Sequence, residues 1–224
     1  MLILAADTAL GACSAAVTEN GKVRAHAFAL MVRGHAEALA PMVEHVMAEA
    51  GAAFTDLERL GVTTGPGTFT GQRVGLAFMR GLALTLKLPL AGVTTLDVMA
   101  EEALSKTGAH GAIACVDARR GEIYFGVRLA GGKTVADPRL LPLAIAVADV
   151  AALDVGKNVA VAGSASEMLA PLLATRGIDA RDSGVREPDA QFVAKLAAQA
   201  EIPNAPPRPL YLRPPDAKLP GVAR

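Results

Sequence analysis

The chain of 224 residues contains no tryptophan, and aromatic residues make up only 4% of it. Its apolar content is nevertheless 52%, carried mostly by alanine, leucine and valine. A chain of this size buries roughly 70% of the surface that its unfolded form exposes, so it needs neither disulfides nor metals to form a core. The sequence predicts a globular protein of one large domain or two smaller ones.

An excess of charge of either sign is also missing, because 22 Lys and Arg residues balance 22 Asp and Glu residues. The totals therefore provide no broad positive field of the kind that binds nucleic acid unaided. Any contact with RNA must be local or supplied by a partner.

Cysteine is scarce, and Cys13 and Cys115 lie far apart without a C-x-x-C pair. This pattern argues against metal binding and redox cycling, and it favours two small buried side chains in a reducing cytoplasm.

Long hydrophobic runs are absent as well. The N-terminus reaches Asp7 without the basic flank and apolar run of a signal peptide, and the apolar stretch 74–86 carries Arg80 and is too short to span a bilayer. We expect a cytoplasmic protein with no membrane segment.

The first half of the chain alternates strand-like runs with helical periodicity. Asn20-Gly21 between two strand-like runs predicts a β-hairpin, because both turn positions need a positive φ. Apolar residues spaced three and four apart predict helices. We expect strands at 2–6, 12–18, 22–30, 57–64 and 90–94, and helices at 34–51, 71–87 and 96–105, the last with Thr95 as a candidate cap.

The second half begins again with strands and ends in a proline-rich tail. We expect strands at 112–117, 122–130, 133–140 and 159–162, and helices at 144–153, 164–176 and 188–201. The tail is expected to be extended or loose rather than helical, because half of all the prolines lie in it: Pro203, Pro206, Pro207, Pro209, Pro214, Pro215 and Pro220.

This order of elements predicts a tandem α/β architecture, the duplicated ribonuclease H-like fold of actin and the sugar kinases. We place an N-terminal subdomain at 1–108 and a C-terminal subdomain with the proline-rich tail at 109–224. Whether the last helix packs on the first subdomain stays open.

A glycine-rich loop, 65–71, connects a strand to a helix. Backbone amides at such a position bind phosphate well, but the loop has no lysine and the spacing G-x-G-x-x-x-G fits neither a Walker loop nor a dinucleotide fingerprint. The alternative is a tight strand-to-helix turn that lets the helix approach its neighbours closely.

The two helices on either side of this loop each carry a rich apolar face, while Arg73, Arg80 and Lys87 form a separate basic stripe. One interpretation is a pair of core helices with a solvated edge. The other is a surface that docks on a second protein. The interface residues would then be Leu39, Met42, Val43, Val46, Met47, Leu76, Met79, Arg80 and Ala83.

Metal and nucleophile signatures are missing. Four residues after His35 comes Leu39 rather than a second ligand, and His26, His45 and His110 have no suitably spaced neighbours. No catalytic residue, metal site or cofactor is predicted.

Two acidic residues occupy corresponding positions at the ends of the first strand in each half. Asp7 with Thr8, and Asp117, stand where an actin-like fold places residues facing phosphate and metal. Each aspartate serves equally well as a turn former, so they are candidates for a degenerate phosphate site only.

The sequence resembles the TsaB (YeaZ) family of tRNA threonylcarbamoyladenosine biosynthesis proteins over nearly its whole length. The segments that carry the resemblance are Ala5-Ala6-Asp7-Thr8, the run 35–41 (HAEALAP), the run 65–75 (GPGTFTGQRVG), the run 116–124 (VDARRGEIY) and Pro209-Leu210-Tyr211-Leu212-Arg213.

This resemblance implies a two-domain actin-like fold without a working catalytic centre. The family is similar to TsaD, the subunit that transfers a threonylcarbamoyl group to the adenosine beside the anticodon of tRNAs reading codons that begin with A. His35 matches the first histidine of a metal-binding pair in TsaD, and Leu39 replaces the second.

The resemblance also implies partners. The two N-terminal helices would pack on the equivalent helices of a TsaD homologue, a small ATPase of the TsaE type would join, and tRNA would be reached through the complex. Homodimers through the same surface occur in the family. The alternatives are an autonomous ATPase or kinase, with Asp7 and Asp117 holding a magnesium-bound nucleotide, and a peptidase.

Overall fold

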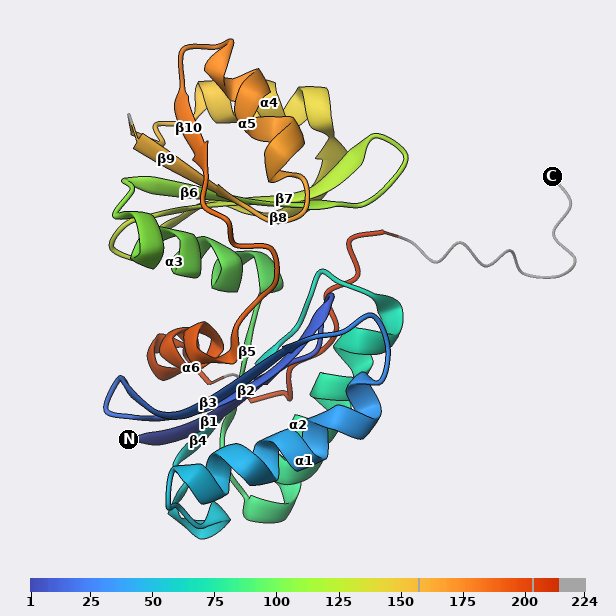
Figure 1. Ribbon diagram of the computed structural model, residues 1–224, viewed down its shortest axis with the longest axis vertical. Coiled ribbons are helices and arrows are strands. Elements are labelled where there is room, and N and C mark those ends of the chain that lie inside the picture. Colours follow the sequence, from blue (N-terminus) through green and yellow to red (C-terminus); the bar gives the residue numbers. More distant parts are fainter. Residues whose placement is uncertain (157, 203, 214–224) are drawn as a thin grey trace, which may run out of the picture.

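Two five-stranded sheets, one above the other in Figure 1, form the centre of the structure, a computed structural model that describes residues 1–156, 158–202 and 204–213. The first half consists of β1 (Leu2–Asp7), β2 (Ala12–Glu19), β3 (Lys22–Leu30), α1 (His35–Glu49), a 3-10 turn (Phe54–Asp56), β4 (Arg59–Thr63), α2 (Phe69–Leu86), β5 (Leu90–Val93) and α3 (Thr95–Thr107). The second half consists of β6 (Gly111–Asp117), β7 (Glu122–Leu129), β8 (Thr134–Pro142), α4 (Leu143–Ala152), β9 (Asn158–Ala162), α5 (Ser166–Ala174), β10 (Asp179–Asp182) and α6 (Ala190–Gln199).

The two sheets have the same topology. The first has the order β3-β2-β1-β4-β5, and the second, read from its far edge, has the order β8-β7-β6-β9-β10. In each sheet the first three strands are antiparallel and the last two run parallel to the central strand. The predicted duplication of a ribonuclease H-like unit is therefore confirmed.

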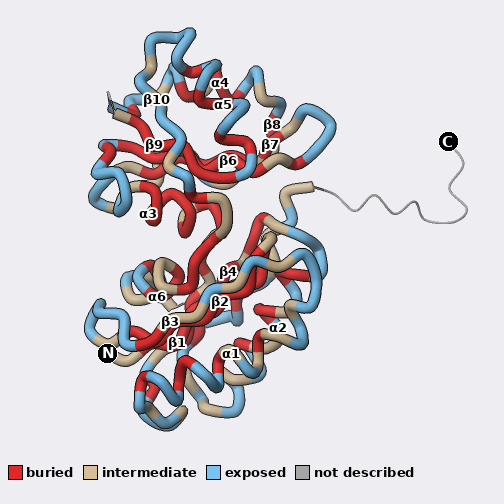
Figure 2. The backbone as a smooth tube through the Cα atoms, in the orientation of Figure 1, coloured by how far each residue is buried: buried red, intermediate tan, exposed pale blue. Residues whose placement is uncertain are grey.

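Successive side chains of the central strand β1 point to opposite faces of the first sheet, and different helices cover the two faces. Leu4 and Ala6 of β1 pack with α1 and α2, whereas Ile3 and Ala5 pack with α6 on the opposite face. Both faces of β1 are buried, so its sequence is continuously apolar rather than alternating (Figure 2).

The helices α3 and α6 each pack on the sheet formed by the other half of the chain. The α3 helix, although it lies before residue 108, covers the second sheet through Leu96, Met99 and Ala103. The last helix, α6, covers β1, β2 and β4 of the first sheet. A boundary at residue 108 thus separates the two sheets but not the two helical layers.

The predicted hairpin forms, and the cap of α3 lies one residue from the predicted position. Asn20 and Gly21 have φ angles of 51° and 79°, as the hairpin requires. The cap of α3 is Thr94 rather than the expected Thr95, because Thr94 keeps an extended backbone and its hydroxyl accepts the N–H of Asp97 at 3.0 Å.

A few predictions differ from the structure. The edge strand β10 was not predicted, because its four residues, Asp179–Asp182, contain no apolar alternation. Residues 204–213 of the tail are non-helical as expected, while Pro203, Pro214, Pro215 and Pro220 lie outside the described residues. No helix of the described chain combines the length and the apolar character needed to cross a membrane.

Close packing of α6 on the first sheet depends on Gly61 in β4. A Cβ atom at Gly61 would lie 2.8 Å from the Cβ of Ala197 and 3.3 Å from that of Ala5. We expect Gly61→Val to lower the free energy of unfolding by about 1–3 kcal/mol, because the added methyl groups push α6 away.

The matched control is Gly81→Ala on α2, where a Cβ atom would meet nothing within 4 Å. This change should raise the free energy of unfolding by about 0.5–1 kcal/mol, because it removes an exposed glycine from a helix interior. Urea denaturation of the full chain measures both, and an unchanged midpoint for Gly61→Val would contradict the packing of α6.

Candidate functional site

The end of β1 places Asp7 deep inside the protein. Its side chain is 0% exposed, and its Oδ1 accepts hydrogen bonds from the Thr63 hydroxyl and from the N–H of Ala9. No described residue donates to the buried Oδ2. Burial raises the pKa of Asp7 to about 7, although its hydrogen bonds act in the opposite direction.

Thr8 is used inside the fold in the same way. Its hydroxyl donates to the carbonyl of Gly71 at 2.7 Å and accepts the N–H of Gly75 at 2.9 Å. The residue is only 1% exposed. Both of its hydrogen bonds go to the first turns of α2, so its side chain is unavailable to a phosphate in this arrangement.

The glycine-rich loop allows the start of α2 to lie close to the backbone of Thr8 and Ala9. The N–H of Thr68 donates to the carbonyl of Ala9 at 2.8 Å. A Cβ atom at Gly67 would lie 2.3 Å from that carbonyl oxygen, and one at Gly71 would lie 2.2 Å from the carbonyl oxygen of Thr8. The loop is therefore the tight turn considered as the alternative, and its glycines permit contact with the β1–β2 turn.

Asp117 ends β6, as Asp7 ends β1, but it serves as a turn former. Its Oδ1 accepts the N–H of Arg119 at 2.8 Å, and its own N–H donates to the Ser164 hydroxyl at 3.0 Å. Arg119 and Arg120 follow with φ angles of 66° and 60°. The two aspartates occupy corresponding strand ends, but Asp7 bonds the hydroxyl of a neighbouring strand, whereas Asp117 bonds the turn that follows it.

The predicted partner-binding residues prove to be core residues. Each of the following is at most 2% exposed and packs in the first core: Leu39, Val43, Val46, Met47, Leu76 and Met79. The prediction that they form a docking surface is wrong, because the apolar stripe of each helix faces the chain's own sheet. Met42 and Ala83 are partly buried against the same core, and only Arg80 of the predicted set is exposed.

The accessible side of the helix pair is a different set of residues. On α2 it contains Ala77, Arg80, Gly81, Leu84 and Thr85, and on α1 it contains Pro41, Glu44, His45 and Ala48. Leu84 is 83% exposed.

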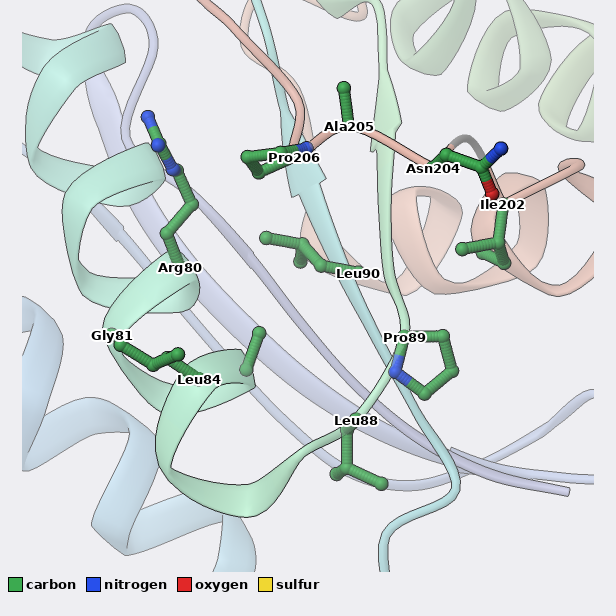
Figure 3. Close-up of a pocket in the computed structure, with 11 residues that line it drawn as sticks. Arg80, Gly81, Leu84, Leu88, Pro89, Leu90, Ile202, Asn204, Ala205 and Pro206 are labelled. Carbon is green, nitrogen blue, oxygen red and sulfur yellow. The ribbon is translucent and has the colours of Figure 1, made fainter.

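A cavity of about 470 Å³ adjoins this surface, between the C-terminal half of α2 and the segment after α6 (Figure 3). Leu84 and Arg80 lie on one side of it, and Ile202 and Pro206 lie on the other. Leu88 and Leu90 contribute to its largely apolar lining. Sequence periodicity missed this groove because it forms between distant segments.

The histidine at the start of α1 has a structural partner. The Nε2 of His35 lies 3.1 Å from the carbonyl oxygen of Leu10, and Leu39, one turn later, is buried in the core. Within the described ranges, no group of three His, Cys, Asp or Glu side chains is placed to hold a metal ion.

Three segments named in the sequence analysis meet at one place. The glycine-rich loop and the first turn of α2 that follows it contribute Phe69 and Gln72 to a cavity of about 210 Å³. Tyr124 of β7 and Tyr211 and Arg213 of the tail line the same cavity. The tail is anchored to both halves of the chain: Leu210 donates its N–H to the Thr64 carbonyl at 2.8 Å, and Arg213 pairs with Glu122 at 2.6 Å. Sequence reasoning missed this junction, although all three segments stood out as motifs.

The raised pKa of Asp7 predicts a pH-dependent stability. A carboxyl group whose pKa rises from 3.8 to about 7 on folding binds more protons in the folded state, so stability falls as pH rises across that interval. Asp7→Asn removes this loss, which amounts to at most about 4 kcal/mol. In urea denaturation, the free energy of unfolding of the variant relative to the unmodified chain should increase between pH 4 and 7. Parallel pH profiles for the two proteins would contradict a raised pKa at Asp7.

Comparison with known proteins agrees with this fold. Residues 29–200 match the family model of TsaD, tRNA N6-adenosine threonylcarbamoyltransferase. The chain is 46% identical to the tRNA threonylcarbamoyladenosine biosynthesis protein TsaB of Escherichia coli over 125 residues, which cover 56% of this chain and 54% of the relative. The match thus spans about half the length of that relative and of its Haemophilus influenzae counterpart. A protein of Mycobacterium tuberculosis with no assigned function is 35% identical, with coverage of 96% and 93%.

Solved structures extend the comparison over nearly the whole chain. YeaZ from Pseudomonas aeruginosa has a TM-score of 0.81 and 30% identity, with 94% of this chain and 99% of that chain covered. A hexokinase of the ROK family from Thermus thermophilus, with a TM-score of 0.51, 16% identity and coverage of 89% and 98%, shares the fold alone. The family model, the relatives and the YeaZ structure together show that this chain belongs to the TsaB (YeaZ) family.

Proposed function

We propose that the chain is a non-catalytic subunit of a threonylcarbamoyl transferase complex, which binds and activates a TsaD homologue. A TsaE homologue joins this complex, and the product is threonylcarbamoyladenosine beside the anticodon of tRNAs that read codons beginning with A. The names of the curated relatives support the pathway, and the match to the TsaD family model supports a partner of the same fold.

The observation that carries the non-catalytic role is the closed end of β1. In an actin-like enzyme the residues at this position face phosphate and metal, but here Asp7 and Thr8 are 0% and 1% exposed. The hydroxyl of Thr8 already bonds Gly71 and Gly75. A magnesium-bound nucleotide could reach neither side chain unless the packing around the end of β1 opened.

The docking surface that we assign to the partner is the outer side of the helix pair. Its centre is Gly81 and Leu84 on α2, next to the apolar cavity shown in Figure 3. Nothing lies within 4 Å of a Cβ atom placed at Gly81, so a partner helix can approach the backbone closely. An exposed leucine beside an apolar groove provides apolar surface that a protein partner can bury.

Two substitutions test this surface. Leu84→Glu and Gly81→Trp should each weaken binding of the TsaD homologue at least about tenfold, because one places a charge and the other a bulky ring in the interface. Both positions are exposed, so neither change should lower the melting temperature of the isolated chain.

The matched control is Ile145→Glu on α4 of the second domain, where the isoleucine is 49% exposed. It introduces the same charge away from the helix pair and should leave binding unchanged. Size-exclusion chromatography of co-expressed subunits and a tRNA modification assay provide the measurements. Full binding by both Leu84→Glu and Gly81→Trp would reject the outer side of the helix pair as the docking surface.

The rival role, an autonomous ATPase, makes the opposite prediction about nucleotide binding. Because Asp7 and Thr8 are enclosed, we expect calorimetry with ATP and magnesium to show no micromolar binding to the purified chain. Micromolar binding that is lost in Asp7→Asn would favour the ATPase. No observation in the structure favours a peptidase.

A further inference from the structure

Aromatic side chains are scarce in this chain but gather at one cavity. The sequence holds six phenylalanines and two tyrosines, and three of these eight, Phe69, Tyr124 and Tyr211, line the cavity of about 210 Å³ at the junction of the two halves. The cavity is smaller than the roughly 300–1,000 Å³ typical of drug-sized ligands, so it accommodates one small planar group.

Two of the rings form an open platform. Phe69 and Tyr211 are stacked, with centroids 6.0 Å apart and an angle of 24° between the ring planes. They remain 59% and 48% exposed. Two neighbouring rings exposed beside a cavity leave aromatic surface on which a planar ligand can stack.

A cation stiffens this platform. The guanidinium of Arg73 lies 3.6 Å from the centroid of Phe69 and 5.8 Å from that of Tyr211, and its Nε donates to the Tyr211 hydroxyl at 2.8 Å. The arginine therefore holds Tyr211, and with it the tail, against the start of α2.

An amide with unused bonding capacity faces the same cavity. Gln72 lines the cavity and is 3% exposed, yet its Oε1 has no hydrogen-bond partner among the described residues. The absence of a side chain at Gly65 makes room for it, because a Cβ atom there would lie 2.7 Å from the Gln72 Cδ. A buried amide offers one acceptor and two donors, the pairing that glutamine makes with the edge of a purine.

We propose that this aromatic junction binds a nucleobase, which stacks on Phe69 or Tyr211 and pairs through its edge with Gln72. The identification of RNA as the source of the base rests on the proposed function, since the complex acts next to unpaired bases of an anticodon loop. Stacking of splayed bases on aromatic and guanidinium planes is the usual way in which proteins read single-stranded RNA.

The balanced charge of the chain bears on the expected affinity for RNA. With a net charge of zero, the chain has no broad positive field that attracts RNA, so binding should be weak. Removal of one stacking ring should lower the affinity about tenfold or more.

The test uses the purified full chain and three ligands, measured by calorimetry or NMR titration: adenosine monophosphate, a single-stranded RNA pentamer, and the same pentamer without bases. We expect the pentamer to bind about tenfold more tightly than its abasic form. Tyr211→Ala and Gln72→Leu should each weaken the pentamer about tenfold. Tyr211→Phe, which keeps the ring but loses the bond from Arg73, should stay within about twofold of the unmodified chain.

Equal affinity for the abasic pentamer, or unchanged binding in Tyr211→Ala, would overturn the nucleobase pocket. Binding of adenosine monophosphate without binding of the pentamer would support a base pocket but reject RNA as its source. Since no partner is present, Leu84→Glu should bind the pentamer normally. Failure of the docking proposal and failure of the base pocket are therefore seen in separate experiments.

Discussion

The start of α2 is held against the β1–β2 turn, and this contact determines where both ends of the helix lie. Thr8 bonds Gly71 and Gly75 through one hydroxyl, and the absence of side chains at Gly67 and Gly71 allows the two backbones to touch. Asp7, the residue before Thr8, lies on the other face of the sheet, opposite Ser14, and is also fully buried. We propose that the buried end of β1 excludes a nucleotide, while the turn that follows it fixes the start of α2.

Fixing α2 has two further consequences. Its first turn carries Phe69, Gln72 and Arg73 to the junction with the tail, and its last turns leave Gly81 and Leu84 on the outside. A single helix thus connects the aromatic junction at one end with the proposed docking surface at the other. The exchange of α3 and α6 between the halves, together with the tail, ties both sheets to this arrangement.

Much of the fold follows from local patterns in the sequence. The Asn20-Gly21 turn, the change from strand-like to helical periodicity and the repetition of strands in the second half were sufficient to predict the duplicated topology, because hairpins and amphipathic helices carry short-range signals. The short strand β10 carries no such signal, since its residues are mostly charged. The choice between Thr94 and Thr95 as a cap depends on a single pair of backbone angles.

The candidate site was predicted less completely, for a physical reason. Periodicity shows that α1 and α2 each have an apolar side, but it does not show what that side contacts, so Val46 and Met79 were assigned to a partner when they belong to the core. A charged residue at either position would unfold the chain rather than block docking. The meeting of Phe69, Tyr124 and Tyr211 depends on tertiary contacts between segments more than 50 residues apart, which no local pattern encodes.

We propose that this chain supports catalysis by a sister subunit and performs none itself. The most direct measurement is threonylcarbamoyl transfer to tRNA, with the activated donor supplied, by the purified chain alone, by its TsaD homologue alone and by the two together. The closed end of β1 predicts no transfer by the chain alone and a clear stimulation of the homologue when both are present. Transfer by the chain without its partner, or no stimulation of the partner, would contradict the claim.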